Sequence, residues 1–285
     1  MSVFVEASVE NVKQSRVTNP IQHSSFQILE KALNDLFLKE LNSADSIFIK
    51  ISPNVVKKIA MFMSGMAFRP AAIGICGETA CGKSTIVQDS ICVINEILHN
   101  DVVTRINTDD YYHDRSYEVE MAGSFEEFAK NYDLDVPEAI ELSLMKEHIL
   151  MLLNRQEVYL PKYDMSGTAK RLDNHRFAEP SSVIFAEGLY TLIDGVGDVF
   201  DFKIYVDIDR NVQKKRFFER AEQRGLGVSA DKIFVNAAQK AQIHVHPCIK
   251  NADIVLNGET SREKYKKFVN SVLSLIKSVS RVNLL

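Results

Sequence analysis

Gly77-Glu78-Thr79-Ala80-Cys81-Gly82-Lys83-Ser84 matches the pattern G-x-x-x-x-G-K-[ST] at every fixed position. A chance match in a chain of this length has a probability of roughly one in a hundred at average residue frequencies. The glycines let backbone N–H groups curve around a phosphate, and the following helix adds the positive end of its dipole. Lys83 would bring a cation to the β- and γ-phosphates, and Ser84 a hydroxyl to Mg²⁺. We expect these eight residues, with the adjoining Thr85, to bind ATP.

The loop lies between a predicted strand and a predicted helix, which is the context that phosphate binding requires. A β-branched run covers residues 71–76 before it, and helix-like sequence follows from Lys83 to about His99. Further apolar runs predict strands at residues 102–106, 183–186, 203–206 and 254–256, with helical stretches between them. Alternating strands and helices imply a parallel sheet with helices on both faces. The predicted fold class is therefore α/β, with a parallel sheet of the P-loop NTPase type.

The segments that flank this region are predicted to be helical. Residues 1–70 form an N-terminal helical extension to a domain of residues 71–285, although residues 1 to about 22 lack a pattern. Apolar residues at three- and four-residue steps predict a helix from Ser25 to Leu41, and Ser52-Pro53 begins a second that ends near Gly65. This pair either regulates or dimerises the protein, or packs on the main domain, which is the simpler interpretation. A last helical stripe covers residues 261–279.

Composition excludes several classes of protein. The 285 residues are 46% hydrophobic and carry a net charge of −4, so no long-range attraction draws the chain to nucleic acid or an anionic membrane. The longest mostly apolar stretch, residues 59–68, is far shorter than the ~20 residues of a membrane span. The four cysteines have no pairing or metal-ligand spacing. We expect a cytoplasmic protein that acts on a small molecule and binds neither nucleic acid nor membrane; homo-oligomer formation is left open.

A carboxylate after the second strand of the domain limits the classes of phosphate-binding protein to which the chain can belong. The chain has no N-K-x-D base reader and no LSGGQ-like signature, which disfavours guanine-specific switches and transporter ATPases. Asp109 directly follows the strand that ends near Asn107, where an open α/β sheet presents its ligands. A carboxylate there can accept the proton of an acceptor hydroxyl while a phosphoryl group moves. A turn is the alternative role for Asp109 and the favoured role for Asp110 or Asp114.

Together, these motifs resemble the uridine kinase (uridine-cytidine kinase) and phosphoribulokinase family of P-loop kinases over residues 71–258. Four further segments carry the resemblance: a D-x-F-Y-like segment at 109–112, an N-F-D-x-P-x-A-like segment at 131–139 with two extra residues, P-x-Y-D at 161–164, and E-G at 187–188. An arginine-rich lid helix would lie around residues 209–225. The resemblance implies an ATP- and Mg²⁺-dependent kinase that phosphorylates a hydroxyl of a small metabolite, with uridine or cytidine as the leading acceptor.

The resemblance also implies roles for single residues. Asp109 would be the general base, with Lys83 as the second catalytic residue, and the Mg²⁺ would lie among Ser84, Asp109 and Glu187. A metal at Glu187 is also favoured because a buried acid without a charge partner is expensive. The lid would bring Arg216 and Arg220 to the ATP phosphates. The acceptor would be bound by Tyr112, Asp133, Tyr163, Arg216 and Arg224.

Departures from the family pattern leave alternatives open. No histidine follows P-x-Y-D where nucleoside-binding members have one, and Lys170 and Arg171 lie there instead, which would suit an acceptor that carries a phosphate or carboxylate. A phosphoribulokinase-like or pantothenate kinase-like acceptor is therefore one alternative, and a catalytically inactive nucleotide-binding regulatory protein is another. Cys81 either fits the loop as a small residue, which is favoured, or is sensitive to oxidation.

Overall fold

The computed structural model describes residues 20–65, 70–98, 102–223, 227 and 229–279. A six-stranded sheet lies at its centre, with strand order β1-β8-β7-β2-β6-β3. The strands are β1 (Phe48–Ile51), β2 (Ala71–Cys76), β3 (Val103–Asn107), β6 (Val183–Gly188), β7 (Phe202–Asp207) and β8 (Ile254–Asn257). All neighbouring strands are parallel except β1, which is antiparallel to β8. The five strands predicted from the sequence are all present, and the predicted α/β class is confirmed.

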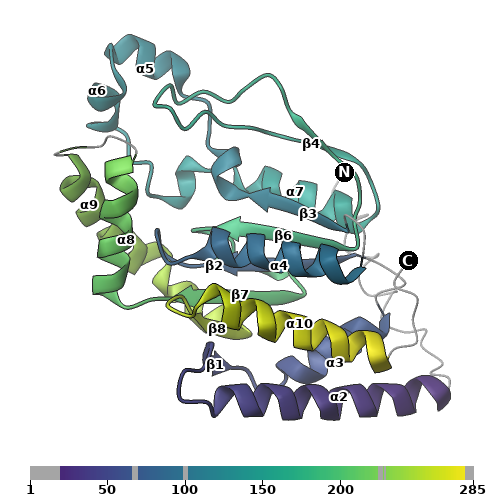
Figure 1. Cartoon of the computed structure of the whole chain (residues 1–285). Coiled ribbons are helices and arrows are strands. Elements are labelled where there is room, and N and C mark those ends of the chain that lie inside the picture. The colour runs from purple at the N-terminus through teal and green to yellow at the C-terminus, as the bar shows by residue number, and fades with distance from the viewer. Residues whose placement is uncertain (1–19, 66–69, 99–101, 224–226, 228, 280–285) are drawn as a thin grey trace.

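Helices cover both faces of this sheet (Figure 1). One buried cluster joins β2, β3 and β6 to α7 and α9, and a second joins the opposite side chains of β2 and β6 to α4. Strands that are buried on both faces have almost continuous apolar sequence, which is why short apolar runs identified them. The longer helices are α2 (Pro20–Leu41), α3 (Val55–Gly65), α4 (Lys83–Leu98), α7 (Leu142–Leu153), α8 (Arg210–Gln223), α9 (Ser229–His244) and α10 (Arg262–Val279).

A smaller layer lies at one end of the sheet. Its elements are the short helices α5 (Ser116–Ala122) and α6 (Phe125–Ala129), and α8 and α9 stand at the same end, on the left of Figure 1. A hairpin of β4 (Val158–Leu160) and β5 (Arg176–Ala178) connects α7 to β6. Helix α8 covers most of residues 209–225, and the role of this helix as a lid stays a prediction. Among those residues, no helix is both long and apolar enough to cross a membrane.

The segment before residue 70 contributes a strand as well as helices, and the sequence did not predict that strand. Helix α2 begins five residues before the predicted Ser25, and α3 ends at the predicted Gly65. β1 pairs with β8, while α2 packs against α3 and α10. Phe37 and Phe48 stack with ring centroids 5.3 Å apart, and Phe268 of α10 meets both rings edge-on. The described part of this segment therefore packs on the main domain; residues 1–19 lie outside the described residues, and its standing as a separate domain stays a prediction.

We expect Asp89 of α4 to make the packing of α10 pH-dependent. Its carboxylate is 2% exposed and accepts two hydrogen bonds from Arg262, of 2.7 and 3.0 Å. The Arg262 guanidinium holds the pKa of Asp89 below its ordinary 3.8, against the opposing effect of burial. A carboxyl group whose pKa is lower in the folded state than in the unfolded state stabilises the folded protein when the pH is above the unfolded-state pKa. This stabilisation is lost as the pH falls through the folded-state pKa.

We expect Asp89→Asn to lower the free energy of unfolding at pH 7 by about 1 to 3 kcal/mol, the usual worth of hydrogen bonds to a charged group. Urea unfolding at a series of pH values would check this, with Glu263→Gln on the exposed side of α10 as the control. The deficit of the Asn variant should shrink below about pH 4, because the native carboxyl is then being protonated as well. A deficit that is the same at pH 7 and pH 3 would contradict this role.

Candidate functional site

The loop between β2 and α4 adopts a conformation that its glycines make possible. Gly77 has a φ of +152°, and a Cβ there would lie 2.5 Å from the carbonyl oxygen of Val206. Gly82, directly before α4, has a φ of +104°. Residues with side chains rarely adopt these angles, so the two fixed glycines of the pattern have a structural reason. They let the loop turn tightly into the N-terminus of α4.

Lys83 lies at the start of that helix and reaches back across the loop. Its Nζ donates a hydrogen bond of 2.8 Å to the carbonyl oxygen of Glu78. Ser84 and Thr85 follow in the first turn, and both side chains are exposed. A cation, two hydroxyls and the N–H groups of a helix start thus meet at one place, which suits a chain of phosphates.

A cleft of about 700 Å³ opens beside this loop. It joins the loop to the ends of β3 and β6 and to the lid helix α8, as expected for ligand sites at the carboxyl ends of parallel strands. The cleft brings together most of the residues that the sequence assigned to ATP and Mg²⁺: Thr79, Ala80, Gly82, Lys83, Ser84, Thr85, Asp109, Glu187, Arg216 and Arg220. Tyr112, which the sequence assigned to the acceptor, also lines it.

Three residues of the loop do not line this cleft. Gly77 and Cys81 are buried beneath it, and Cys81 is only 1% exposed. All four cysteines are free thiols. The burial of Cys81 supports its interpretation as a small residue that fits the loop. Glu78 turns toward α8 instead, where its Oε2 accepts hydrogen bonds from Arg210 (2.8 Å) and Gln213 (3.0 Å).

The lid helix is attached to the loop by several polar contacts. Arg220 donates to the Thr79 hydroxyl at 2.7 Å, and Arg216 donates to the carbonyl of Gly258 at 2.8 Å. Arg210 and Gln213, which the sequence did not single out, fasten the helix to Glu78. No local pattern marks them, because their partner is about 130 residues away. Arg224 lies outside the described residues.

Asp109 lies at the floor of the cleft, directly after β3. Its backbone N–H donates to the side chain of Asn107 at 3.1 Å, which begins a short 3-10 helix at Thr108–Tyr111. Burial raises the pKa of Asp109, Lys83 opposes the shift, and the charge of Glu187 adds to it. The three side chains are therefore close enough to influence one another. A carboxylate near a cation and next to open space can accept a proton from a bound hydroxyl.

Glu187 has a charge partner that the sequence did not reveal. Its carboxylate, 1% exposed, accepts hydrogen bonds from Arg105, with Nε 2.7 Å from Oε1. Asn107 is opposite Glu187 in the parallel pairing of β3 and β6, so Arg105 is a diagonal neighbour on the same face. The sequence argument that Glu187 is a buried acid without a partner was therefore wrong. The ion pair with Arg105 already offsets the cost of burying Glu187. The case for a metal at Glu187 therefore rests only on the chemistry of the oxygen ligands around it.

That donor set fits Mg²⁺. Ser84, Asp109 and Glu187 supply a hydroxyl and two carboxylates that line one cleft, and Mg²⁺ prefers oxygen ligands. Within the described ranges, no group of three or more His, Cys, Asp or Glu could hold a metal by itself. Magnesium in phosphoryl-transfer sites is usually held by one or two carboxylates and the phosphates of the substrate, so this smaller set is sufficient.

A second cleft of about 590 Å³ adjoins the first, and Tyr112 and Met165 line both. The rings of Tyr112 and Tyr163 lie 5.2 Å apart at the junction. Burial raises the pKa of Tyr163 to about 12, so its hydroxyl keeps its proton at neutral pH. The charged side chains in the lining are Glu126 and Asp164, and no Lys, Arg or His is among the described residues that line it.

Two aspartates of residues 131–139 lie close to this junction, and they differ in their partners. Asp133, which the sequence assigned to the acceptor, pairs with Lys240 of α9 at 2.6 Å and accepts from the backbone N–H of Asp135. Although burial opposes it, these contacts hold the pKa of Asp133 below its ordinary value. Asp135 accepts one hydrogen bond, from Asn236 at 3.0 Å, and burial raises its pKa. Neither aspartate lines the two clefts directly.

The spacing of Asp135 could have singled it out. The family segment ends in D-x-P-x-A, and Asp135, Pro137 and Ala139 have that spacing, with the two extra residues lying before them. The Tyr112 hydroxyl donates a hydrogen bond of 3.3 Å to the carbonyl oxygen of Leu134, so the next residue, Asp135, lies near the junction of the clefts. Its charge also raises the pKa of Tyr112, after burial and Asp109.

Arg171 does not take the role that its sequence position suggested. Its guanidinium donates to Glu141 at 2.7 Å and to the carbonyl oxygens of Tyr111 and Tyr112 at 3.0 and 2.9 Å. The side chain therefore holds the backbone after Asp109 in place. Lys170 is exposed, and neither residue lines the second cleft. The expectation that these two cations bind an anionic acceptor is wrong for Arg171.

Comparisons with known proteins show which family the chain is similar to. The model of the Phosphoribulokinase / Uridine kinase family matches residues 72–263. A uridine kinase of Halobacterium salinarum is 33% identical over 189 residues, which are 65% of this chain and 79% of the relative. A uridine kinase of Clostridium perfringens is 32% identical over 193 residues, 66% of this chain and 87% of the relative. The solved phosphoribulokinase of Rhodobacter spheroides is 15% identical and covers 67% of this chain and 73% of that chain, with a TM-score of 0.49.

Proposed function

We propose that this chain, which belongs to the phosphoribulokinase and uridine kinase family, transfers the γ-phosphoryl group of ATP to a hydroxyl of uridine or cytidine. Family membership makes it a kinase with a small-molecule acceptor. The choice of a nucleoside is the further step. It rests on the lining of the second cleft, which adjoins the phosphate site at Tyr112.

The charge of that lining distinguishes between acceptors. Ribulose 5-phosphate carries a phosphate and pantothenate a carboxylate, and either anion would lie near Glu126 and Asp164 without a cation among the described lining residues. Placing like charges together in a partly enclosed site is unfavourable. Uridine and cytidine are neutral, and their rings can pack against Tyr112 and Tyr163. A neutral nucleoside is therefore the acceptor that this cleft suits best.

Each residue of the first cleft would then have its own role in phosphoryl transfer. Asp109 accepts the proton of the attacking hydroxyl, while Lys83 neutralises charge on the γ-phosphate. Arg216 and Arg220 approach the phosphates from the lid. Ser84, Asp109 and Glu187 would hold Mg²⁺, which when bound neutralises phosphate charge. These groups position the reactants and stabilise charge, which is most of what phosphoryl transfer needs.

The experiment that tests this proposal is ADP release from Mg-ATP with a panel of acceptors: uridine, cytidine, ribulose 5-phosphate, pantothenate and none. We expect stimulation by uridine or cytidine alone. Stimulation only by an anionic acceptor would overturn the argument from the second cleft. No stimulation by any acceptor, with ATP still bound, would favour the alternative of an inactive nucleotide-binding protein.

Asp135 is proposed to hold the hydroxyls of the ribose, because Asp133 is already paired with Lys240. We expect Asp135→Asn to raise the KM for uridine about 10- to 100-fold, as the loss of hydrogen bonds to a charged group predicts. Asp133→Asn is the matched variant and should raise it less. Steady-state kinetics at saturating ATP would compare the two, and a larger effect at Asp133 would return the role to that residue.

A further inference from the structure

Glu78, the second residue of the phosphate loop, turns its side chain away from the first cleft and toward helix α8. Its Oε2 accepts hydrogen bonds from Arg210 at 2.8 Å and from Gln213 at 3.0 Å, and Arg210 also donates to Oε1 of Gln213 at 2.6 Å. Gln213 is 2% exposed, and the side chain of Glu78 is 12% exposed. Because a buried polar group that loses its partner is costly, each of the three side chains depends on the others.

Helix α8 also binds the next residue of the loop, Thr79. Nε2 of Gln213 donates a second hydrogen bond, of 2.9 Å, to the carbonyl oxygen of Thr79. Arg220 donates to the Thr79 hydroxyl at 2.7 Å. Residues 210, 213, 217 and 220 are three or four positions apart, so they share one face of the helix. That face lies against the phosphate loop.

Ala80 completes the attachment through an apolar contact. Its φ is +59°, a left-handed backbone conformation that residues with a side chain rarely adopt. Its side chain packs against the buried cluster that α8 forms with α9, which consists of Phe217, Ala221, Ala230 and Phe234. This contact offsets part of the cost of the backbone conformation. The consecutive residues 78–80 are therefore each attached to α8.

Glu78 connects this attachment to the groups that would bind phosphate. Its own carbonyl oxygen accepts the 2.8 Å hydrogen bond from Lys83. Arg216, three residues after Gln213 on α8, lines the cleft together with Lys83 and Arg220. The backbone of Glu78 thus contacts the cation of the loop, and its side chain contacts the helix that carries the two arginines. A change in this side chain should shift the arginines relative to Lys83.

We infer that Glu78 is a positioning residue of the donor site: with its two partners on α8, it holds the arginines of that helix in place relative to Lys83. The inference rests on the proposed binding of ATP in the first cleft. It extends the donor site to a residue that does not line the cleft and so touches no substrate. A residue with this role should affect binding of the donor's phosphates and leave the contribution of its base unchanged.

The test compares ATP with inorganic tripolyphosphate, which has the phosphates and no base. Calorimetry on the full chain would measure the Kd of each for the native protein, Glu78→Ala and Glu78→Gln. We expect Glu78→Ala to weaken both ligands about tenfold, the usual worth of hydrogen bonds to a charged group. Glu78→Gln should stay within about threefold of the native protein, because its amide oxygen can accept both hydrogen bonds and an ion pair to the partly exposed Arg210 adds little.

A second pair of variants exchanges donor and acceptor between the loop and the helix, and it stays informative if Glu78→Ala folds poorly. Gln213→Glu places a second carboxylate beside that of Glu78, and repulsion between the two should weaken both ligands about 100-fold. Glu78→Gln in the same chain restores a donor opposite an acceptor, so the double variant should bind both ligands about tenfold more tightly than Gln213→Glu alone. Urea unfolding of each variant would give the folded fraction, so that every Kd refers to folded protein.

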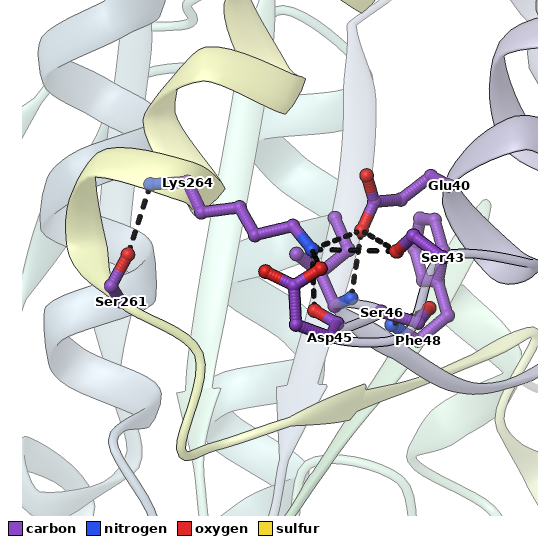
Figure 2. Close-up of polar contacts among 8 residues, drawn as sticks. Glu40, Ser43, Asp45, Ser46, Phe48, Ser261 and Lys264 are labelled. Atoms are coloured by element: carbon purple, nitrogen blue, oxygen red, sulfur yellow. Dashed lines mark hydrogen bonds and ion pairs between the residues drawn. The ribbon is translucent and has the colours of Figure 1, made fainter.

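Two further variants are controls. Glu219→Ala removes an exposed carboxylate of α8 whose partner, Lys215, is 4.0 Å away. Lys264→Met breaks a polar cluster elsewhere, shown in Figure 2, in which Lys264 of α10 pairs with Asp45 at 2.6 Å and with Glu40 at 3.1 Å. None of these residues lines either cleft. We expect both variants to change either Kd less than about twofold, although Lys264→Met should lower the free energy of unfolding.

Kinetics supply the last measurement. Glu78→Ala should raise the KM for ATP about as much as the Kd and leave the KM for uridine within about twofold, because residues 78–80 do not line the second cleft. Native Kd values for Glu78→Ala, weaker binding of ATP alone, or no recovery in the double variant would overturn the inference. Failure of the native protein to phosphorylate uridine, with both ligands still weakened by Glu78→Ala, would overturn the proposed acceptor and leave the inference standing.

Discussion

Asp109→Asn is expected to lower kcat about 10²- to 10⁴-fold, which is the usual contribution of a positioned general base. The variant keeps the size of the side chain and its place after β3, but an amide cannot accept a proton at neutral pH. The loop and lid that would hold the phosphates are unchanged, so ATP should still bind. Calorimetry would measure ATP binding, since the chain has no Trp to report it by fluorescence, and ADP release would measure turnover.

Asp114→Asn is the matched control for this variant. Asp114 lies five residues further on, and its exposed carboxylate accepts hydrogen bonds from Ser116 and from the backbone of Arg171. It lines neither cleft, so the same chemical change there should leave turnover within about twofold of the native rate, as surface substitutions usually do. A near-native rate for Asp109→Asn would remove Asp109 from the mechanism.

Lys83→Met should lower kcat/KM for ATP about 10²- to 10³-fold, comparable to the loss of one preorganised donor to a developing charge. Methionine nearly matches the length of the lysine stem but cannot neutralise a phosphate or donate to one. The effect should appear in both the Kd of ATP and kcat, because the charge acts on bound and reacting phosphates.

Lys215→Met controls for loss of a positive charge near the site. Lys215 is on the lid helix, its side chain is 77% exposed, and its only ion pair among the described residues is a 4.0 Å contact with Glu219. We expect it to behave as the native protein. If Lys83→Met and Lys215→Met had equal effects, the phosphate loop would not be the donor site.

Local patterns predicted the parts of the site that are local in structure. The loop from Gly77 to Ser84 and the carboxylate at Asp109 are each fixed by a few consecutive residues between a strand and a helix. The central strands were equally visible, because burial on both faces requires short apolar runs. These elements place the phosphate site at the ends of β2 and β3.

Contacts that depend on the register of distant segments were not predictable. Arg105 reaches Glu187 only because β3 and β6 pair in parallel with Asn107 opposite Glu187. Arg171 supports the backbone of Tyr111 and Tyr112, about 60 residues earlier, and its sequence neighbours give no sign of this.

The strand β1 was missed for a different reason. Phe48–Ile51 has four residues at the edge of the sheet, and the side chains of its two middle residues are exposed, so it has neither a continuous apolar run nor a clear alternation. Its place is decided by pairing with β8 and by the contacts of Phe48 with Phe37 and Phe268.

The most direct measurement is the fate of the label from γ-³²P-labelled ATP incubated with Mg²⁺, uridine and the full chain. We predict that the label appears in uridine monophosphate in proportion to the ADP formed, and that omission of uridine abolishes it. Label that appears only as inorganic phosphate, or that stays in ATP whichever neutral nucleoside is supplied, would contradict the assignment of this cleft pair to nucleoside phosphorylation.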